Sequence, residues 1–128
     1  MNLNQVTVYS RDVPSAIRFY EKLGLKLIVD SAPRYVRFEC PDGESTFSIH
    51  ETDSDTVCGS VVLYFECDDL DGTVEGLRSR GIEFDSGPED KDWLWREASL
   101  RDPDGHRIIL FHAGENRKDP PWKVGTED

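Results

Sequence analysis

An internal repeat constrains the fold of this chain more than any other feature of its sequence. Asp12 and Gly24 recur 57 positions later as Asp69 and Gly81. Aspartate is a favourable N-cap and glycine a favourable left-handed C-cap, so each pair predicts a helix of the same length. A Pro-Asp-Gly turn follows each predicted helix, which makes a chance match between unrelated segments less attractive. We therefore expect two copies of one structural unit.

Each copy is expected to contain one helix and four strands. In the first copy, residues 5–10 alternate between polar and apolar types, as a half-buried strand does, and the helix follows at once. Short extended runs at 25–29, 34–40 and 45–51 are separated by turn residues. The second copy restarts with a strand at 61–67. The predicted order of elements is βαβββ in both copies.

This pattern predicts an α+β fold in a single domain. A chain of 128 residues matches the usual size of one domain and can bury an apolar core without disulfides. We place the domain at residues 1–113, with half-repeats at about 3–56 and 59–113. Residues 114–128 show no periodicity and are expected to form an irregular C-terminal tail.

Charge and hydropathy exclude several classes of partner. Acidic residues outnumber basic ones 26 to 15, and the net charge of −11 repels the phosphate backbone of nucleic acids. The same charge would attract a cationic small molecule, although a solvated acidic surface is the simpler explanation. The apolar runs are strand-sized, whereas a membrane span needs about 20 apolar residues. We expect neither a nucleic-acid nor a membrane partner.

The predicted location is the cytoplasm. The first five residues have neither the basic start nor the apolar stretch of a secretory signal. The three cysteines, Cys40, Cys58 and Cys67, form no CxxC pair, and their odd number argues against a closed disulfide framework. They are expected to be reduced.

Several motifs resemble those of the glyoxalase, bleomycin-resistance and extradiol-dioxygenase proteins, the vicinal-oxygen-chelate superfamily. The resemblance covers residues 3–112 and rests on Arg11-Asp12-Val13, Phe19-Tyr20-Glu21-Lys22-Leu23-Gly24-Leu25, Asp68-Asp69-Leu70, Leu77-Arg78-Ser79-Arg80-Gly81-Ile82 and Asp102-Pro103-Asp104-Gly105-His106. It implies a U-shaped mixed sheet around one cavity, a divalent metal held by both halves, and a homodimer. Caps and turns carry no catalytic group, so these motifs specify the fold and not the reaction.

The positions at which this family holds its metal are poorly suited to one here. The first-strand ligand, usually His or Gln, falls on Gln5 and, by the offset of 57, on Val62. The ligand on the last strand of each half falls at or near Ser48 and on Ile109. Valine and isoleucine offer no lone pair, and such metals normally take three or four protein ligands. We assign no cofactor, and a displaced divalent metal is the alternative.

Strand alternation predicts which side chains line the cavity, because the apolar face of each strand should meet a helix. Leu94 and Ala98 are assigned to the helix side, whereas Tyr35 and Ser99 face the cavity. An aromatic wall with a few ionisable groups is typical of a small-molecule pocket. The predicted binding residues on the cavity face are Gln5, Arg37, His50, Tyr64, Glu66, Trp93, Trp95, Glu97 and Phe111.

Each of the more telling residues also has a plainer structural explanation. Trp93 and Trp95 either stack on a planar ligand or fill space on a curved sheet. Glu66 either pairs with Arg37 or has a functional role, because a carboxylate on a cavity face needs a partner or a raised pKa. His50 either has a binding or acid-base role or makes a hydrogen bond at the cavity rim.

Three functions are consistent with these patterns. The first is a metal-independent protein that binds a small planar or cationic molecule. The second is an enzyme, a glyoxalase-type lyase or isomerase or a ring-cleaving dioxygenase, with a displaced metal at Gln5, His50 and Glu66. Its candidate catalytic residues are Glu66 and Glu97, the latter as a general base. The third is an accessory module without a ligand, whose concave face or tail meets a protein partner.

Overall fold

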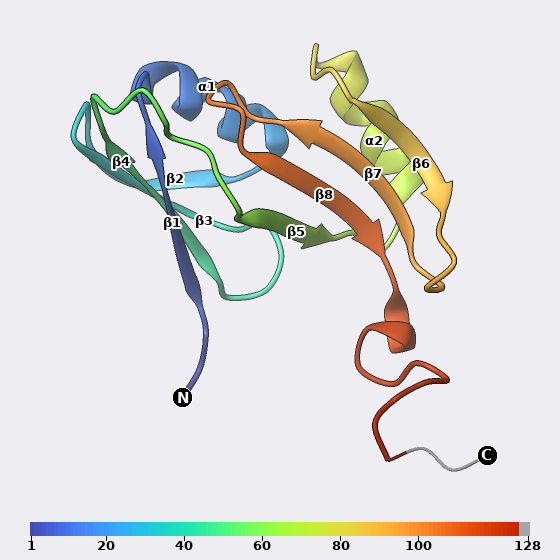
Figure 1. Cartoon of the computed structure of the whole chain (residues 1–128). Coiled ribbons are helices and arrows are strands. Elements are labelled where there is room, and N and C mark those ends of the chain that lie inside the picture. Colours follow the sequence, from blue (N-terminus) through green and yellow to red (C-terminus); the bar gives the residue numbers. More distant parts are fainter. Residues whose placement is uncertain (126–128) are drawn as a thin grey trace. The chain divides into compact units, whose positions relative to one another are not determined.

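The computed structural model describes residues 1–125. This part of the chain contains eight β-strands, two α-helices and one 3-10 helix, and the strands form two four-stranded sheets. Two compact units result: the first holds residues 1–61 and 101–107, and the second holds residues 62–100 and the chain from residue 108 on. Figure 1 shows α1 with the first sheet and α2 with the second. The predicted α+β class is confirmed.

The first unit contains β1 (Gln5–Ser10), α1 (Val13–Leu23), β2 (Lys26–Ser31), β3 (Tyr35–Glu39) and β4 (Thr46–Glu51). Its strands lie in the order β1-β4-β3-β2. β1 pairs with β4 in parallel, and the other two strand pairs are antiparallel. The first and last strands of the βαβββ unit are therefore neighbours in its sheet.

Helix α1 begins and ends as the sequence predicts. Asp12 Oδ1 accepts a hydrogen bond of 3.2 Å from the Ser15 amide. Gly24 ends the helix with a left-handed φ of 112°, which glycine adopts without steric cost. Tyr20 is fully buried, and its ring lies 4.6 Å from that of Phe47, centroid to centroid. The helix thus covers the apolar face of the sheet and leaves the opposite face to polar side chains.

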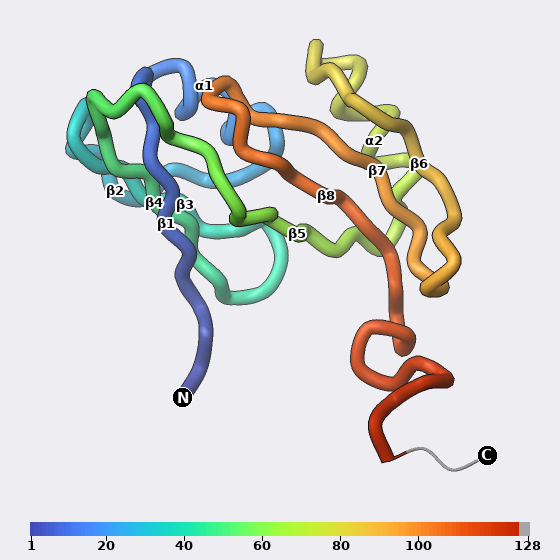
Figure 2. Tube along the Cα trace, in the orientation of Figure 1, coloured from blue at the N-terminus to red at the C-terminus, as the bar shows by residue number. Residues whose placement is uncertain are grey.

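The second Pro-Asp-Gly turn belongs to the first unit, and Figure 2 shows this orange segment beside α1. Buried Asp102 accepts hydrogen bonds of 2.7 Å from Tyr20 Oη and 2.9 Å from the His106 amide. Burial raises the pKa of Asp102, and these hydrogen bonds offset part of the effect. Burial, followed by the nearby Asp102, raises the pKa of Tyr20, so its phenol stays protonated and donates. The turn motif therefore has a structural role.

The second unit repeats the order of the first. Its strands lie in the order β5-β8-β7-β6. Among the described residues, neither helix of the chain is long and apolar enough to cross a membrane. The elements of this unit are β5 (Val62–Glu66), α2 (Leu70–Ser79), β6 (Ser86–Asp90), β7 (Arg96–Arg101), β8 (Arg107–His112) and the 3-10 helix η1 (Gly114–Arg117).

The predicted repeat is confirmed in the hydrogen bonds at the helix ends. The Leu25 amide donates to the Tyr20 carbonyl at 3.0 Å, and the Ile82 amide donates to the Leu77 carbonyl at 3.1 Å. These two pairs differ by the offset of 57 residues found in the sequence. Asp69 caps the start of α2 through its side chain, as its counterpart does in α1. The duplication therefore extends to the backbone geometry of both helix ends.

The turn before β7 differs from the expectation. Alternation assigned residues from Trp93 onward to one strand, but β7 begins at Arg96. The Lys91 amide donates to the Trp95 carbonyl at 2.8 Å and closes a turn, in which Leu94 has a left-handed φ of 68°. Residues with a β-carbon rarely adopt this conformation. As a result Leu94 is half exposed, not directed toward the helix.

Candidate functional site

Polar and aromatic side chains collect on one face of the first sheet. Helix α1 packs on the other face, where the buried residues are apolar. Three of the predicted binding residues, Gln5, Arg37 and His50, share the polar face. The register places the following residues in three neighbouring rows across β1, β4 and β3: Tyr9, His50 and Tyr35; Thr7, Ser48 and Arg37; Gln5, Thr46 and Glu39.

Tyr35 is the centre of a hydrogen-bonded cluster on this face. Its Oη accepts a hydrogen bond of 2.8 Å from Arg37 Nε and lies 2.9 Å from Ser48 Oγ. Ser48 is completely buried, whereas Tyr35 and Arg37 are partly buried. Burial opposes ionisation of the phenol, but the hydrogen bonds of Ser48 and Arg37 outweigh it and lower the pKa of Tyr35. The cluster combines a fixed cation with two hydroxyl groups.

His50 and Gln5 flank this cluster. The exposed His50 ring lies between two tyrosines, with centroid distances of 6.1 Å to Tyr9 and 4.8 Å to Tyr35. Gln5 Oε1 accepts a hydrogen bond of 2.9 Å from Thr46 Oγ1. The amide oxygen that the sequence offers as a metal ligand is therefore engaged with a neighbouring strand.

The second unit brings three predicted aromatic residues together. Trp95 stacks on Phe111, with centroids 4.5 Å apart and planes inclined by 14°. Tyr64 meets both rings edge-on, at 6.1 Å from Trp95 and 5.7 Å from Phe111. Tyr64 is exposed, Trp95 is partly buried and Phe111 is buried. We call these three residues the aromatic wall.

Val62 and Ile109 pack into an apolar cluster that continues from the aromatic wall. Buried Ile109, Phe111 and Ala113 form this cluster, and Val62 and Trp95 pack against it. Val62 and Ile109 occupy the two second-half positions that the resemblance assigns to metal ligands. Hydrocarbon side chains have no donor atom, so the second half supplies neither ligand.

Glu66 anchors the C-terminal tail. Its Oε2 accepts hydrogen bonds of 2.8 Å and 2.9 Å from the amides of Ala113 and Gly114, and its Oε1 lies 3.4 Å from Arg117 Nε. Burial opposes ionisation, but the two amides and the Arg117 charge outweigh it and lower the pKa of Glu66. The sequence suggested Arg37 as the partner of this carboxylate, and the partner in the structure is Arg117. Both carboxylate oxygens are engaged.

The tail begins against the aromatic wall. Trp95 Nε1 donates a hydrogen bond of 3.3 Å to the carbonyl of Asn116, which lies in η1. Further along, Trp122 is 58% exposed. The predicted tail covers residues 114–128, of which 126–128 lie outside the described residues.

Glu97 is a buried carboxylate with an aromatic partner. Its Oε2 accepts a hydrogen bond of 2.6 Å from Trp93 Nε1. Its cross-strand neighbour on β6 is another acid, Glu89, which pairs with Lys91 at 3.1 Å. Within the described part of the second unit, no cation lies within ion-pair distance of Glu97. The turn that holds Trp93 therefore also positions a carboxylate that has no counterion among the described residues of its own unit.

Sequence comparison agrees with the duplicated fold. The sequence model of the Glyoxalase/Bleomycin resistance protein/Dioxygenase superfamily matches residues 2–110. The chain belongs to this superfamily. It is 26% identical over 125 residues to the uncharacterized protein YraH of Bacillus subtilis (strain 168), with 87% of this chain and 98% of YraH covered. It is 29% identical over 117 residues to YetH of the same strain, also uncharacterized, with 84% and 95% covered.

Solved structures of superfamily proteins share this fold. A lactoylglutathione lyase from Agrobacterium tumefaciens matches with a TM-score of 0.72 at 17% identity, covering 87% of this chain and 92% of that one. A glyoxalase/bleomycin resistance protein/dioxygenase from Nocardioides matches with a TM-score of 0.73 at 22% identity, covering 99% and 87%. Identities this low establish a common fold and leave the reaction to the residues of the site.

The residues at the expected ligand positions do not fit the divalent metal that is common in the superfamily. Val62 and Ile109 provide no donor atom, and Glu66 uses both oxygens to hold the tail. Within residues 1–125, no group of three or more His, Cys, Asp or Glu side chains is placed to hold a metal ion.

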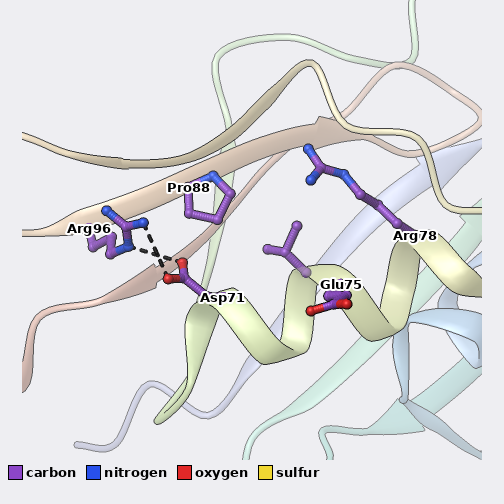
Figure 3. Close-up of a pocket in the computed structure, with 6 residues that line it drawn as sticks. Asp71, Glu75, Arg78, Pro88 and Arg96 are labelled. Atoms are coloured by element: carbon purple, nitrogen blue, oxygen red, sulfur yellow. Dashed lines mark hydrogen bonds and ion pairs between the residues drawn. The ribbon is translucent and has the colours of Figure 1, made fainter.

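An open hollow elsewhere in the second unit contains none of the predicted site residues. Figure 3 shows Arg96 joined to Asp71 within it. Arg96 Nε lies 3.0 Å from Asp71, and Arg96 Nη1 lies 3.0 Å from Asp90. Exposed ion pairs of this kind contribute little to the free energy of unfolding. We therefore interpret the hollow as the site of a surface ion-pair network. Its lining residues are Asp71, Val74, Glu75, Arg78, Pro88 and Arg96.

The sequence did not predict all members of the Tyr35 cluster or the tail residues that contact Trp95 and Glu66. It placed Tyr35 on the polar face and Ser48 at a ligand position, but it did not connect either residue with Arg37. The partners that the tail supplies, Asn116 and Arg117, lie in a segment without periodicity, so no pattern could identify them. Strand pairing was the signal available for Tyr35 and Ser48. Arg37 lies opposite Ser48 on the paired strands β3 and β4, and Tyr35 lies diagonally from Ser48 on the same face.

Proposed function

We propose that this superfamily member is a metal-independent binding protein for a small planar or cationic molecule. The observation that carries the proposal is the aromatic wall beside the apolar cluster of Val62 and Ile109. Rings and hydrocarbon side chains there favour contact with a flat apolar surface. Aromatic pairs add about 0.5–1.5 kcal/mol beyond the apolar area that they bury. The exposed ring of Tyr64 is the side chain available for such stacking.

The charge distribution supports a cationic group on the ligand. Glu97 is buried with only an indole donor on its Oε2, and an uncompensated buried carboxylate is costly. A cationic ligand would supply the missing counterion. The net charge of −11 would also raise the local concentration of cations around the chain.

The alternative, an enzyme with a displaced metal at Gln5, His50 and Glu66, has weaker support. The oxygens of Gln5 and Glu66 already make hydrogen bonds within their own units. Binding roles for the predicted site residues, and catalytic roles for Glu66 and Glu97, remain predictions. The binding proposal requires none of these residues to change its present partners.

The proposal is tested by fluorescence in the Trp122→Phe variant, whose remaining tryptophans, Trp93 and Trp95, both lie in the second unit. The probe is N-methylacridinium, and uncharged acridine at alkaline pH is the matched neutral compound. In excess chelator we expect saturable quenching by both compounds, with tighter binding of the cation. Tyr64→Ala should weaken binding about tenfold, the equivalent of one good ring contact.

Ile28→Ala serves as the control, because Ile28 is an exposed apolar residue of the first unit. It should bind the probe as the parent does. Absence of saturable quenching by either acridine would reject the proposal. Equal binding of the probe by Tyr64→Ala and the parent would show that the aromatic wall is not the binding surface.

We also propose that the protein is a cytoplasmic homodimer, since members of its superfamily are often dimers. The chain has a mass of 14.6 kDa, so light scattering coupled to gel filtration separates monomer from dimer clearly. A dimer mass that persists on dilution is expected. A monomer mass at every concentration would contradict this assembly.

A further inference from the structure

We propose that Tyr35, Arg37 and Ser48 form a binding site for the carboxylate group of a small organic acid. All three side chains lie on the polar face of the first sheet, and Tyr35 makes a hydrogen bond with each of the other two. The proposal rests on residues of the first unit alone. It goes beyond the proposed function, which rests on the second unit, and either can fail without the other.

Arg37 has the geometry of a carboxylate receptor. Its Nε donates to Tyr35 Oη at 2.8 Å, and its Cζ lies 5.4 Å from the centroid of the Tyr35 ring, so Tyr35 holds the guanidinium in place. The two terminal nitrogens make no hydrogen bond within the described residues of its unit. A pair of terminal N–H groups in one plane matches the two oxygens of a carboxylate. Because Tyr35 already holds these N–H groups in place, a ligand would bind without the cost of ordering the Arg37 side chain.

Arg37 has no counterion among the described residues of its own unit, although the chain is strongly acidic. Its cross-strand neighbours are Val29 on β2 and Ser48 on β4, and neither carries a charge. The next acid on the same face, Glu39, lies 3.9 Å from Lys26 instead. Within the described residues of its unit, no carboxylate lies within ion-pair distance of Arg37. A partly buried guanidinium without an anion is unfavourable, and a bound carboxylate would remove that cost.

The two hydroxyl groups complete the site. Tyr35 Oη accepts from Arg37 Nε and shares a hydrogen bond with Ser48 Oγ. When Ser48 donates in that pair, the phenolic O–H can donate outward to a ligand oxygen. The Gln5 side chain is the remaining polar group of this unit beside the phenol. Because Ser48 is fully buried, it holds the phenol in place and does not contact the ligand itself. Ser48 is therefore a positioning residue, and Tyr35 and Arg37 are the contacts.

The test uses benzoate and its neutral isostere benzamide with the full chain, at matched chloride concentration. The two probes have the same ring, so any binding to aromatic residues is common to both, and their difference reports the carboxylate. Nuclear magnetic resonance follows the Arg37 Nε–H and the Tyr35 ring. We expect saturable shifts of both signals with benzoate and none with benzamide.

Variants of the site decide the role of each group. Arg37→Gln should weaken benzoate binding by about tenfold or more, as loss of a charge-assisted contact does. Arg37→Lys should retain part of the affinity, because it keeps the charge and loses the fork. Tyr35→Phe keeps the ring and should weaken benzoate binding several-fold. The control Arg34→Gln changes an exposed arginine in the preceding turn and should leave the affinity unchanged.

Three results would overturn the proposal. They are equal shifts with benzoate and benzamide, parent-like benzoate binding in Arg37→Gln, and an equal loss in Arg34→Gln. If Arg37→Gln fails to fold, Tyr35→Phe and Arg37→Lys carry the test, and parent-like binding in both would overturn it. Acridine binding is measured on the same samples and reports separately on the second unit.

Discussion

Trp95 stacks on Phe111 in the second unit, with ring planes inclined by only 14°. Phe111 follows Ile109 by two residues on β8, so both side chains lie on the same face of the sheet. The resemblance to the superfamily places metal-ligand positions at Val62 and Ile109, and this chain carries hydrocarbon groups there, beside the aromatic rings. This apolar and aromatic surface underlies the proposed binding function.

Ile109→Ala is expected to destabilise the chain substantially. Ile109 is buried in the apolar cluster, and truncation of such a side chain costs about 2–5 kcal/mol through lost burial and the cavity left behind. Urea denaturation measures the loss. Val61→Ala is the control, because Val61 is more than half exposed and its truncation should cost no more than about 0.5 kcal/mol. Equal losses in the two variants would show that Ile109 is not packed as described.

Tyr20→Phe should destabilise the chain more at neutral pH than in acid. The variant removes the donor to buried Asp102 and should cost about 1–3 kcal/mol when that carboxylate is ionised. The pKa of Asp102 is raised by burial, so its contribution to stability is present at about pH 4 and falls as pH rises through the folded pKa. Above the folded pKa of Asp102, where its carboxylate is ionised, the hydrogen bond from Tyr20 contributes most to the free energy of unfolding.

Denaturation curves of Tyr20→Phe at the two pH values measure this difference. Tyr9→Phe is the matched control, since Tyr9 is 55% exposed and should tolerate loss of its hydroxyl at both. A cost for Tyr20→Phe that does not change with pH would separate the Tyr20 phenol from the ionisation of Asp102.

Glu66→Gln should release the start of the C-terminal tail. The pKa of Glu66 is lowered, so its contribution is present above its ordinary pKa of about 4.3 and is lost as pH falls through the folded value. The amide resonances of Ala113 and Gly114 should therefore titrate with a midpoint below about 4.3 in the parent. They should show no such step in Glu66→Gln.

Trypsin provides a second measure of tail release, because Arg117 and Lys118 are cleavage sites in the tail. Cleavage there should be several-fold faster in Glu66→Gln than in the parent. Glu115→Gln changes an exposed acid within the same segment and should cleave at the parent rate. If Glu115→Gln accelerates cleavage equally, general charge and not the Glu66 anchor governs the tail.

Leu94→Gly should stabilise the chain slightly. The left-handed φ of 68° at Leu94 strains any residue with a β-carbon, at a cost of about 1–3 kcal/mol, and glycine relieves most of it against a smaller entropic loss. We expect a gain of up to about 1 kcal/mol by urea denaturation. Leu94→Ala keeps the β-carbon and should show no gain. A gain of the same size in Leu94→Ala would assign the effect to lost exposed apolar surface.

The fold followed from the sequence because local chemistry decides it. The caps Asp12 and Asp69 and the glycines that end each helix act within a few residues, so a repeat at an offset of 57 could be recognised without any structure. Strand alternation likewise placed Tyr35 and Arg37 on one face. These patterns depend on steric and hydrogen-bonding preferences that tertiary packing did not override.

The finer arrangement of the candidate sites could not be predicted in the same way. Leu94 interrupts the alternation through its left-handed backbone, so Trp93 lies in a turn and reaches Glu97 from there. The anchor of Glu66 comes from amides 47 residues further along the chain, at the start of a segment with no pattern. Long-range partners of this kind are set by chain path and not by local preference.

The most direct test of metal-independent binding is a calorimetric titration of N-methylacridinium into two samples of the chain. One sample is stripped of metal by chelation, and the other is reconstituted with zinc, nickel, manganese or ferrous iron and then desalted. We predict the same affinity in both, with less than about a tenth of an equivalent of metal retained, since intact sites of this class bind tightly. Stoichiometric metal retention, with acridinium binding only in the reconstituted sample, would contradict it.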